Sequence, residues 1–458
     1  MFKRIEVTDI KGFRIGNAEN TDAGTGCTVI ISEKGAVAGV STRGGAPITA
    51  GTDLLRPGST ADRAHAVVLS GGSVYGLEAG SGVMRELEDM GIGNRHGDVV
   101  VPVVSQASLD DLSVGRSDIR PDRTMGIRAV HNAFSGIFRK GNRGAGTGAA
   151  VGKFYGMARA MKTGLGTFAC TDGSVFVGAV TVVNAYADVV DGRMNLVAGL
   201  LSADRKRVDG TIRPLKQCVH ADSKYLGSIN YYEALERARR SESAAVHEPV
   251  AGEVKEIESA NSSEAEVKEQ QADVSMIHSE DIPKTSAPSD KVSAGEPVPG
   301  GVSEDVPTAD STADAVMTAD SPVPENVKTN EEERIDRIEE DKEKRSEPDK
   351  SRPLSDEDAG YNLTFNTTLT CLITNAKLTK AEANELASVL HDGYARSIKP
   401  VHSSEDGDVI FVMASGEEAV NFDAFAALAT DIVQYSVIDG ALSAESAYGL
   451  PSASSFRR

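Results

Sequence analysis

The residue pair Asn366-Thr367 is the strongest chemical signal in this sequence. Leu369, Cys371 and Ile373 alternate with other side chains just after it, which is typical of a β-strand. If the peptide bond within the pair is cut, Thr367 becomes a new N-terminus. Its α-amine, with a pKa of about 8, can then take the proton from its own hydroxyl. We therefore interpret Thr367 as the nucleophile of a self-cleaving hydrolase, although a threonine that starts a strand also fits plain β-propensity.

Two carboxylates flank a glycine in Asp406-Gly407-Asp408, just before the apolar run 409–412. In an extended chain, residues two apart point to the same side, so both carboxylates can face one site. Beside the Thr367 amine they would favour its protonated form, whereas a carboxylate bonded to the hydroxyl would activate it. The alternative is a solvated turn or a weak cation site without a catalytic role.

Two glycine-rich segments could bring further groups to the same site. Gly71-Gly72-Ser73 stands between an apolar run and an expected helix, and such a turn can present N–H groups to an oxyanion or can need glycine for steric reasons alone. The segment 144–153 ends in Lys153 but lacks the glycine spacing and the following hydroxyl of a phosphate-binding loop. Lysine is more often a solvated surface residue, but the small residues before Lys153 weaken that interpretation and leave open a desolvated lysine aimed at a carbonyl.

The elements that must position these residues are strands and helices in a mixed order. Asn184 ends one expected strand, where its amide either starts a turn or donates to an oxyanion. Thr379 and Glu382 have the spacing of a capping box. The periodicities predict strands at 27–32, 36–40, 66–69, 99–104, 174–183, 367–375 and 409–413, and helices at 74–90, 231–240, 331–345, 380–395 and 423–438.

The tract 241–358 differs in composition from the rest of the chain. It holds 32 acidic and 12 basic residues, 10 of the 17 prolines and no Phe, Tyr or Trp, whereas the remaining chain has equal numbers of acidic and basic residues. Such a tract cannot bury enough apolar surface to offset its ordering entropy. We expect a disordered acidic insert at 241–358 in one hydrolase domain made of 1–240 and 359–440, with a flexible tail at 441–458.

Several classes of protein are disfavoured by composition. No basic stripe occurs in the folded part, which argues against nucleic-acid binding. The four cysteines form no CxxC pair and match no zinc spacing, so we expect reduced thiols, no metal and no other cofactor. No apolar run is long enough to span a membrane, and the N-terminus lacks the core of a signal peptide, so we expect a cytoplasmic protein.

Short motifs in a fixed order cover nearly all of the chain outside the acidic tract. They are Thr25-Gly26-Cys27-Thr28-Val29, Arg43-Gly44-Gly45-Ala46-Pro47, Thr52-Asp53-Leu54-Leu55, Gly71-Gly72-Ser73-Val74-Tyr75-Gly76-Leu77, 144–153, Met161-Lys162-Thr163-Gly164-Leu165-Gly166, Val183-Asn184-Ala185, Asn366-Thr367-Thr368 and Asp406-Gly407-Asp408. This series resembles the L-aminopeptidase D-Ala-esterase/amidase family, which includes β-peptidyl aminopeptidases and the nylon-oligomer hydrolase.

The resemblance implies an α/β fold, a four-layer αββα sandwich of the self-cleaving aminopeptidase and ornithine acetyltransferase type. It implies autocleavage at Asn366-Thr367 into two subunits that stay together, and homo-oligomers of the processed unit. By motif, Thr367 is the nucleophile, with Asp406 and Asp408 as the acidic network at its amine and hydroxyl. The implied substrates are small peptides, amino-acid amides or ω-amino-acid oligomers, and no cofactor is needed.

Other residues are placed at the site by the same resemblance. Lys153 and Asn184 would line it and assist cleavage or hold the carbonyl oxygen. Asp110, before the pair Asp111-Leu112, stands where relatives often carry an aromatic residue that faces the site, and an added carboxylate could change the pocket. The acidic tract is also longer than the connection expected in relatives. Two alternatives stay open: an acyltransferase of the ornithine acetyltransferase type, and an inactive hydrolase-like scaffold that presents its acidic segment to partners.

Overall fold

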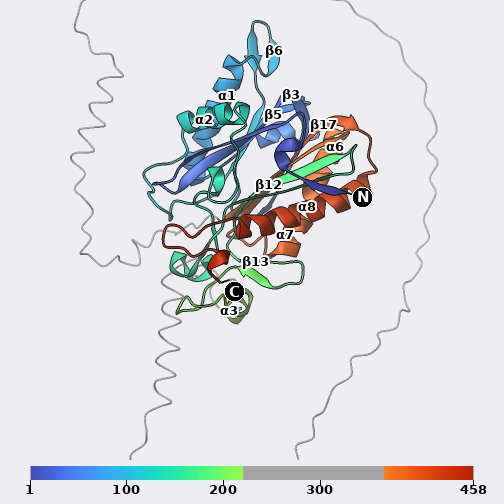
Figure 1. The fold of residues 1–458 in the computed structure, drawn as a ribbon. Helices are drawn as coiled ribbons and strands as arrows, with labels where there is room; N and C mark the ends of the chain where they lie inside the picture. Colours follow the sequence, from blue (N-terminus) through green and yellow to red (C-terminus); the bar gives the residue numbers. More distant parts are fainter. Residues whose placement is uncertain (1, 220–365, 457–458) are drawn as a thin grey trace, which may run out of the picture. The chain divides into compact units, whose positions relative to one another are not determined.

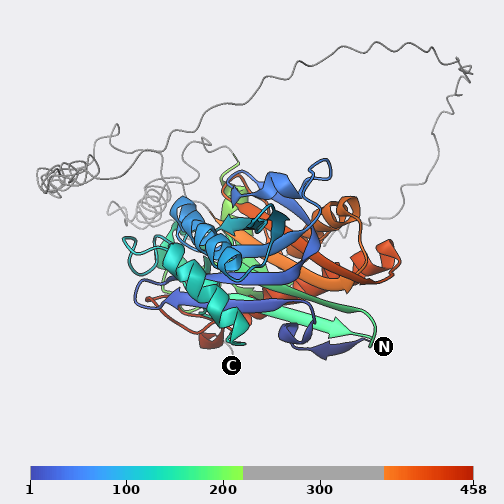
Figure 2. The same cartoon turned by 90° about the horizontal axis from the view of Figure 1, so that it is seen from above.

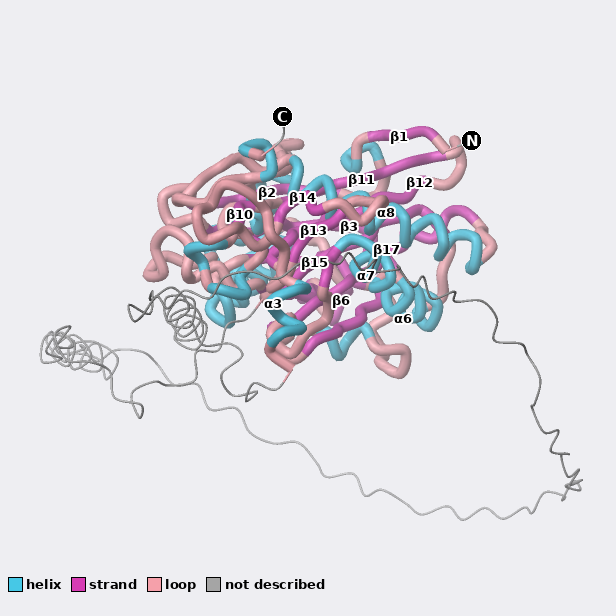
Figure 3. Tube along the Cα trace, turned by 90° about the horizontal axis from the view of Figure 1, so that it is seen from below, coloured by secondary structure: helices cyan, strands magenta, loops and turns pink. Residues whose placement is uncertain are grey.

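The computed structural model describes residues 2–219 and 366–456, which belong to one compact unit of the chain (Figure 1). Its strands form a ten-stranded mixed sheet in the order β1-β11-β12-β15-β17-β3-β5-β8-β4, with β2 paired to β3. The strands are β1 (Lys3–Ile5), β2 (Arg14–Asn20), β3 (Thr25–Gly44), β4 (Ile48–Ala50), β5 (Ala64–Ser70), β8 (Val104–Ser108), β11 (Leu165–Thr171), β12 (Phe176–Asn184), β15 (Thr367–Ala376) and β17 (Gly407–Glu418). Figure 3 shows β1, β11 and β12 side by side at one end of this order.

The long strand β3 divides the sheet into two halves. Its first part pairs with β2 and β5, and its second part pairs with β17. The register shifts between Ile31 and Ala36, where Gly35 has a φ of 71° in the left-handed region that favours glycine. The two strands expected at 27–32 and 36–40 are therefore one strand with an irregularity at the predicted turn.

Helices cover the outer face of each half, which gives four layers (Figures 1 and 2). Helices α1 (Glu78–Asp89) and α2 (Arg123–Phe134) pack on one half through a core that includes Val29 and Val68. Helices α6 (Lys380–Val389), α7 (His391–Ser397) and α8 (Phe422–Leu442) pack on the other half. A third core lies between the halves. The αββα architecture expected from the resemblance is confirmed.

The strand β15 shows how its sequence pattern produces this layering. Leu369, Cys371 and Ile373 belong to the core between the two halves, whereas Leu372 and Ala376 belong to the core under α6–α8. Successive side chains on a strand point to opposite faces, so both faces of β15 are buried. Every residue of β15 is buried, which places Thr367 at the edge of two cores.

Short elements complete the described part of the chain. They are the strand pair β6 (Asn94–His96) and β7 (Val99–Val101), the pair β9 (Ala150–Val151) and β10 (Met161–Lys162), the three-stranded sheet of β13 (Asp188–Val190), β14 (Leu196–Ala198) and β16 (Ile398–Lys399), the helix α3 (Ile212–Gln217) and several 3-10 turns. No helix in the described ranges is both long and apolar enough to cross a bilayer. All four cysteines are buried free thiols.

Several expected boundaries differ from the structure. The apolar run 99–104 is split between β7 and β8 because Pro102 has no N–H to donate to a strand. The helix expected at 74–90 begins as a 3-10 turn (Ser73–Leu77) before α1, and the helix expected at 380–395 is divided at Leu390. The capping box of Thr379 and Glu382 is confirmed at the start of α6.

The end of the chain also differs from the expectation. We predicted a flexible tail from residue 441, but α8 continues to Leu442, and Ser452 and Ala453 are buried. The Lys162 N–H donates to Pro451 O at 2.9 Å, so this segment packs on β10. Residues 441–456 thus belong to the folded domain. The acidic insert and the helices expected at 231–240 and 331–345 lie outside the described residues.

Candidate active site

Strand register brings the predicted site residues together around Thr367, the first residue of β15. On one side β12 pairs antiparallel with β15, and Asn184 is opposite Thr367. On the other side, a parallel bridge joins Asn366 to Asp406, just before β17 begins. Thr367 is fully buried. The candidate nucleophile Thr367, the Asn184 amide and the acidic turn, which are far apart in the sequence, are thus neighbours on three adjacent strands.

The peptide bond between Asn366 and Thr367 is held by two hydrogen bonds to its carbonyl oxygen. The Thr367 hydroxyl donates to Asn366 O with an Oγ–O distance of 2.5 Å, and the Gly407 N–H donates to the same oxygen at 2.6 Å. The Asn366 N–H is fixed to Glu405 O at 2.8 Å. The hydroxyl therefore lies beside the carbonyl that it would attack, and a backbone donor already polarises that carbonyl.

Asp408 links the start of β15 to a histidine that the sequence analysis did not select. Its Oδ1 accepts the Thr368 N–H at 2.7 Å, and its Oδ2 lies 2.7 Å from His402 Nδ1. The His402 ring centroid is 4.8 Å from that of the buried His391. His402 also has a φ of 56°, which is uncommon for a residue other than glycine. In the sequence, His402 stands out only by lying six residues before Asp408. A spacing of six matches no known pattern of catalytic residues, so it did not mark His402 as a site residue.

Asp406 joins its own turn to the segment that follows β12. Its Oδ1 accepts the Tyr186 N–H at 3.0 Å, and its Oδ2 accepts the Ser403 hydroxyl at 2.6 Å and the Ser403 N–H at 3.1 Å. Burial, and then the neighbouring charge of Asp408, raise the pKa of Asp406 to about 6. Both carboxylates are buried beside Thr367, but the hydroxyl of Thr367 donates to Asn366 O in this uncut chain.

Lys153 and Asn184 form a second polar group at the site. Lys153 Nζ donates to Asn184 Oδ1 at 2.6 Å and to Asn184 O at 3.2 Å. The same Oδ1 accepts the Ala150 N–H at 3.1 Å, and Asn184 Nδ2 donates to Asp110 O at 3.0 Å. Burial lowers the pKa of Lys153 to about 8, although the charges of Asp110 and Asp406 oppose this. The structure therefore brings Lys153 and Asn184 together with the backbone carbonyl of Asp110. The Asp110 carboxylate instead accepts the Leu112 N–H at 3.0 Å.

The turn Gly71-Gly72-Ser73 keeps its backbone N–H groups inside the protein. In order, they donate to Gly26 O at 2.9 Å, Asp111 Oδ1 at 2.7 Å and Leu109 O at 2.9 Å. A Cβ added to Gly71 would lie 2.0 Å from Asp111 Oδ2, so any larger residue there would force the Asp111 carboxylate to move. These contacts favour the steric explanation of the glycines over an oxyanion site.

A buried lysine that we assigned no role fastens the segment 144–153. Lys162 is fully buried, and burial lowers its pKa to about 7. Its ammonium donates to three backbone carbonyls, those of Gly146 (3.0 Å), Ala149 (2.9 Å) and Thr163. The neighbouring Asp111 is also enclosed, and burial raises its pKa to about 7. Lys162 therefore holds the backbone that leads to Lys153.

Fold and site together define a class of protein: an αββα sandwich in which the candidate nucleophile begins a central strand after a peptide bond poised for attack. The chain belongs to peptidase family S58, whose family model matches residues 6–213 and 307–453. This membership confirms the family resemblance seen in the motifs.

Individual relatives agree with this assignment. The chain is 39% identical over 201 residues to an uncharacterized aminopeptidase of Mycobacterium leprae, covering 40% of this chain and 54% of that protein. It is 36% identical over 192 residues to a 6-aminohexanoate-oligomer endohydrolase of Paenarthrobacter ureafaciens, covering 42% of this chain and 51% of that protein. The alignments thus span about half the length of these relatives.

Solved structures share the fold. A Burkholderia sp. beta-aminopeptidase superposes with a TM-score of 0.50 at 13% identity, over 97% of this chain and 89% of that chain. The L-aminopeptidase D-Ala-esterase/amidase from Ochrobactrum anthropi, described as a variant of the Ntn hydrolase fold, gives a TM-score of 0.50 at 15% identity, over 96% of this chain and 86% of that chain.

Proposed function

We propose that this protein is a self-processing amide hydrolase that frees Thr367 as an N-terminal nucleophile. The observation that carries the proposal is the pair of hydrogen bonds to Asn366 O, from the Thr367 hydroxyl at 2.5 Å and the Gly407 N–H at 2.6 Å. Membership of a peptidase family supports chemistry at amide bonds. The substrates are small peptides, amino-acid amides or ω-amino-acid oligomers, the last supported by the name of the Paenarthrobacter relative.

The first phase cuts the chain. Thr367 Oγ attacks the carbonyl carbon of Asn366, and the Gly407 N–H stabilises the negative charge that develops on the oxygen. The C–N bond breaks as the hydroxyl proton passes to the nitrogen, which becomes the Thr367 α-amine. Water then hydrolyses the ester and leaves a carboxylate on Asn366 and a free hydroxyl on Thr367. The described contacts fix the reacting groups beforehand, so little further ordering is needed.

The second phase acts on the substrate. The Thr367 amine takes the hydroxyl proton as Oγ attacks the substrate carbonyl, and then passes it to the leaving amine. Asp408 holds the start of β15 through the Thr368 N–H. Lys153 orients the Asn184 amide, and the substrate carbonyl oxygen takes the place of Asp110 O as acceptor for Asn184 Nδ2. Water completes the cycle by hydrolysing the acyl-threonine ester.

The experiment that tests this proposal measures the cleavage itself. Mass spectrometry of the purified chain should show pieces of 366 and 92 residues, with Thr367 at the second N-terminus. Thr367→Ala should stay intact. The matched control is Thr368→Val, because the buried Thr368 hydroxyl has no hydrogen-bond partner in the described part of the chain. This control should be cleaved normally.

Two results would decide against self-processing hydrolysis. A chain that stays intact while it hydrolyses amino-acid p-nitroanilides would remove the N-terminal threonine from the mechanism. An intact and inactive chain would favour the scaffold that presents an acidic segment. Cleavage followed by acyl transfer to an amine, without release to water, would favour the acyltransferase.

A further inference from the structure

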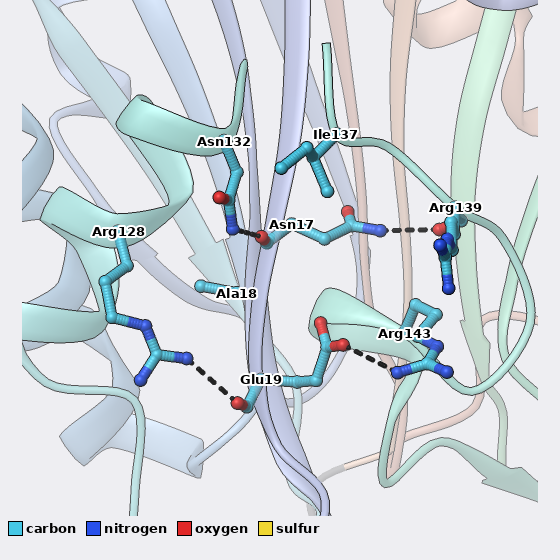
Figure 4. A pocket seen from close by; sticks show the side chains of 8 residues that line it. All are labelled: Asn17, Ala18, Glu19, Arg128, Asn132, Ile137, Arg139 and Arg143. Carbon is cyan, nitrogen blue, oxygen red and sulfur yellow. Dashed lines mark hydrogen bonds and ion pairs between the residues drawn. The ribbon is translucent and has the colours of Figure 1, made fainter. Parts of the chain in front are cut away.

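A pocket of about 270 Å³ lies between α2, β2 and the loop before the segment 144–153, and none of its lining residues is one of the predicted site residues (Figure 4). Arg128 and Asn132 come from one face of α2, where residues four apart are neighbours. Its lining consists of Asn17, Ala18, Glu19, Arg128, Asn132, Ile137, Arg139 and Arg143.

The lining carries three guanidinium groups and one carboxylate. Both oxygens of Glu19 are already used inside the protein, since Oε1 pairs with Arg143 Nη1 at 3.1 Å and Oε2 accepts the Gly144 N–H at 3.0 Å. Arg128 gives one N–H to Glu19 O at 3.1 Å. The Arg139 guanidinium has no hydrogen bond or ion pair to the described residues and reaches the same side of the pocket as Arg143 (Figure 4). The pocket therefore has a formal charge of +2 and many unused donors.

The backbone around these arginines is held in place. The buried Asn17 donates from Nδ2 to Arg139 O at 2.5 Å, and its own carbonyl accepts from Asn132 Nδ2 at 2.7 Å. Asn17 Oδ1 is fixed in turn by the Thr28 hydroxyl at 2.9 Å. The helix α2 and the loop that carries Arg139 and Arg143 are thus tied to β2 through Asn17 and Glu19, and a ligand would not have to order them.

We propose that this pocket binds a small oxyanion with two negative charges, a phosphate or a dicarboxylate. The planar guanidinium fork matches the oxygens of both groups, and a divalent anion balances the net charge of the pocket. The volume is below the range typical of drug-sized ligands, so the anion is small. This proposal does not depend on the hydrolase mechanism.

A second basic pocket in the described residues serves as a comparison. It measures about 820 Å³ and is lined by Lys11, Arg14, Lys34 and Arg63 together with Glu33 and Glu417, among others. Its formal charge is also +2, but it is wider, and Arg14 is paired with Glu33 at 2.5 Å. Arg63 donates to Gly35 O at 3.0 Å. Loss of Arg63 therefore removes the same charge from the protein without touching the proposed anion pocket.

The experiment measures binding of inorganic phosphate and of succinate to the full-length protein by isothermal titration calorimetry. Ionic strength is held constant with sodium chloride, because salt screens exposed charges. One saturable site is expected for at least one anion, and thermal unfolding should shift upward as that anion saturates. Phosphate binding without succinate binding would assign the site to phosphate, and the reverse to dicarboxylates.

Arg139→Gln should raise the dissociation constant for the anion by about 10-fold or more, the scale of a lost charge-assisted hydrogen bond. Arg63→Gln should leave the dissociation constant within about 2-fold of the wild-type value. Arg128→Gln is the second test variant if Arg139→Gln does not fold. The proposal is overturned if neither anion shows saturable binding. It is also overturned if Arg63→Gln weakens binding as much as Arg139→Gln, because the effect would then be general electrostatics.

Discussion

Two tight turns at strand ends use carboxylates in opposite ways. The acidic turn 403–408 runs into the start of β17, and its side chain Asp408 accepts the Thr368 N–H at the start of β15. The glycine turn 71–73 follows β5 and receives its carboxylate from outside, since Asp111 accepts the Gly72 N–H. The first turn supports its neighbour and the second is supported by its neighbour. The position of each motif at a strand end allowed a role at the site for both turns, and only the contacts separate them.

The largest effect is expected from the acidic turn. Asp408→Asn and Asp406→Asn should each fold but lose turnover by at least ~100-fold, the scale expected when proton transfer by the Thr367 amine loses its positioned support. Burial and the charge of Asp408 raise the pKa of Asp406 to about 6, so the wild-type rate should also fall as pH drops through 6 and this carboxylate becomes protonated. Amino-acid p-nitroanilides, assayed on protein already shown to be cleaved, provide the measurement.

A matched control for these variants is Asp53→Asn, because Asp53 is an exposed carboxylate in a surface pair with Arg56. This change should leave turnover unchanged. Near-normal rates in both acidic-turn variants would remove that turn from the mechanism and would make the two turns equivalent.

The glycine turn should respond in stability instead. Gly71→Ala places a Cβ 2.0 Å from Asp111 Oδ2 and 2.5 Å from Thr25 Oγ1, so we expect a loss of about 1–3 kcal/mol in the free energy of unfolding from overpacking. Turnover per folded molecule should stay near that of the wild type. Denaturant unfolding and active-site titration together measure both quantities.

Gly58→Ala is the control for this substitution, since no atom lies within 4 Å of its added Cβ. It should leave stability almost unchanged. A large fall in turnover for folded Gly71→Ala, at normal substrate affinity, would instead return this turn to the site as an oxyanion donor.

A smaller effect is expected from His402, which contacts the Asp408 carboxylate of the acidic turn. Its Nδ1 lies 2.7 Å from Asp408 Oδ2, so His402→Ala should free that carboxylate to rotate and lower turnover by about 10-fold, the scale of one lost hydrogen bond to a charged group. His402→Asn, which can still place an amide N–H beside the carboxylate, should recover part of the rate. Equal rates in the wild type and both variants would show that the Thr368 N–H alone positions Asp408.

The features that could be predicted from the sequence are those that depend on residues close together in the chain. The strand at Thr367 follows from alternation, the start of α6 from the capping box, and the order of layers from the family motifs. The contact between His402 and Asp408 was not predicted from the sequence. It depends on the left-handed φ of His402 itself, between β16 and the acidic turn. Lys162 was also missed, since its partners are backbone carbonyls that no side-chain motif encodes. The packed tail at 443–456 was missed because its contacts are with distant segments.

The smallest effect is expected from shortening the acidic tract that precedes β15. Its composition predicts that deleting 242–355 leaves folding and cleavage at Asn366-Thr367 intact. The deletion leaves 32 residues between Val219 and Asn366, which can reach up to ~100 Å when extended. Loop-closure entropy changes by only about 1 kcal/mol, and a shorter loop favours the folded state.

The measurement compares cleavage and thermal unfolding of the deletion variant with those of a chain that carries a Gly/Ser linker of the original length. Both should be cleaved like the wild type, because the bonds that hold Asn366 come from Glu405 and Gly407 in the folded domain. If both chains stay uncut, the tract itself is needed to form the site and the boundary at 358 is wrong. If only the deletion variant stays uncut, the length of the connection is needed, because the strain of a short loop would then pull Asn366 from the acidic turn.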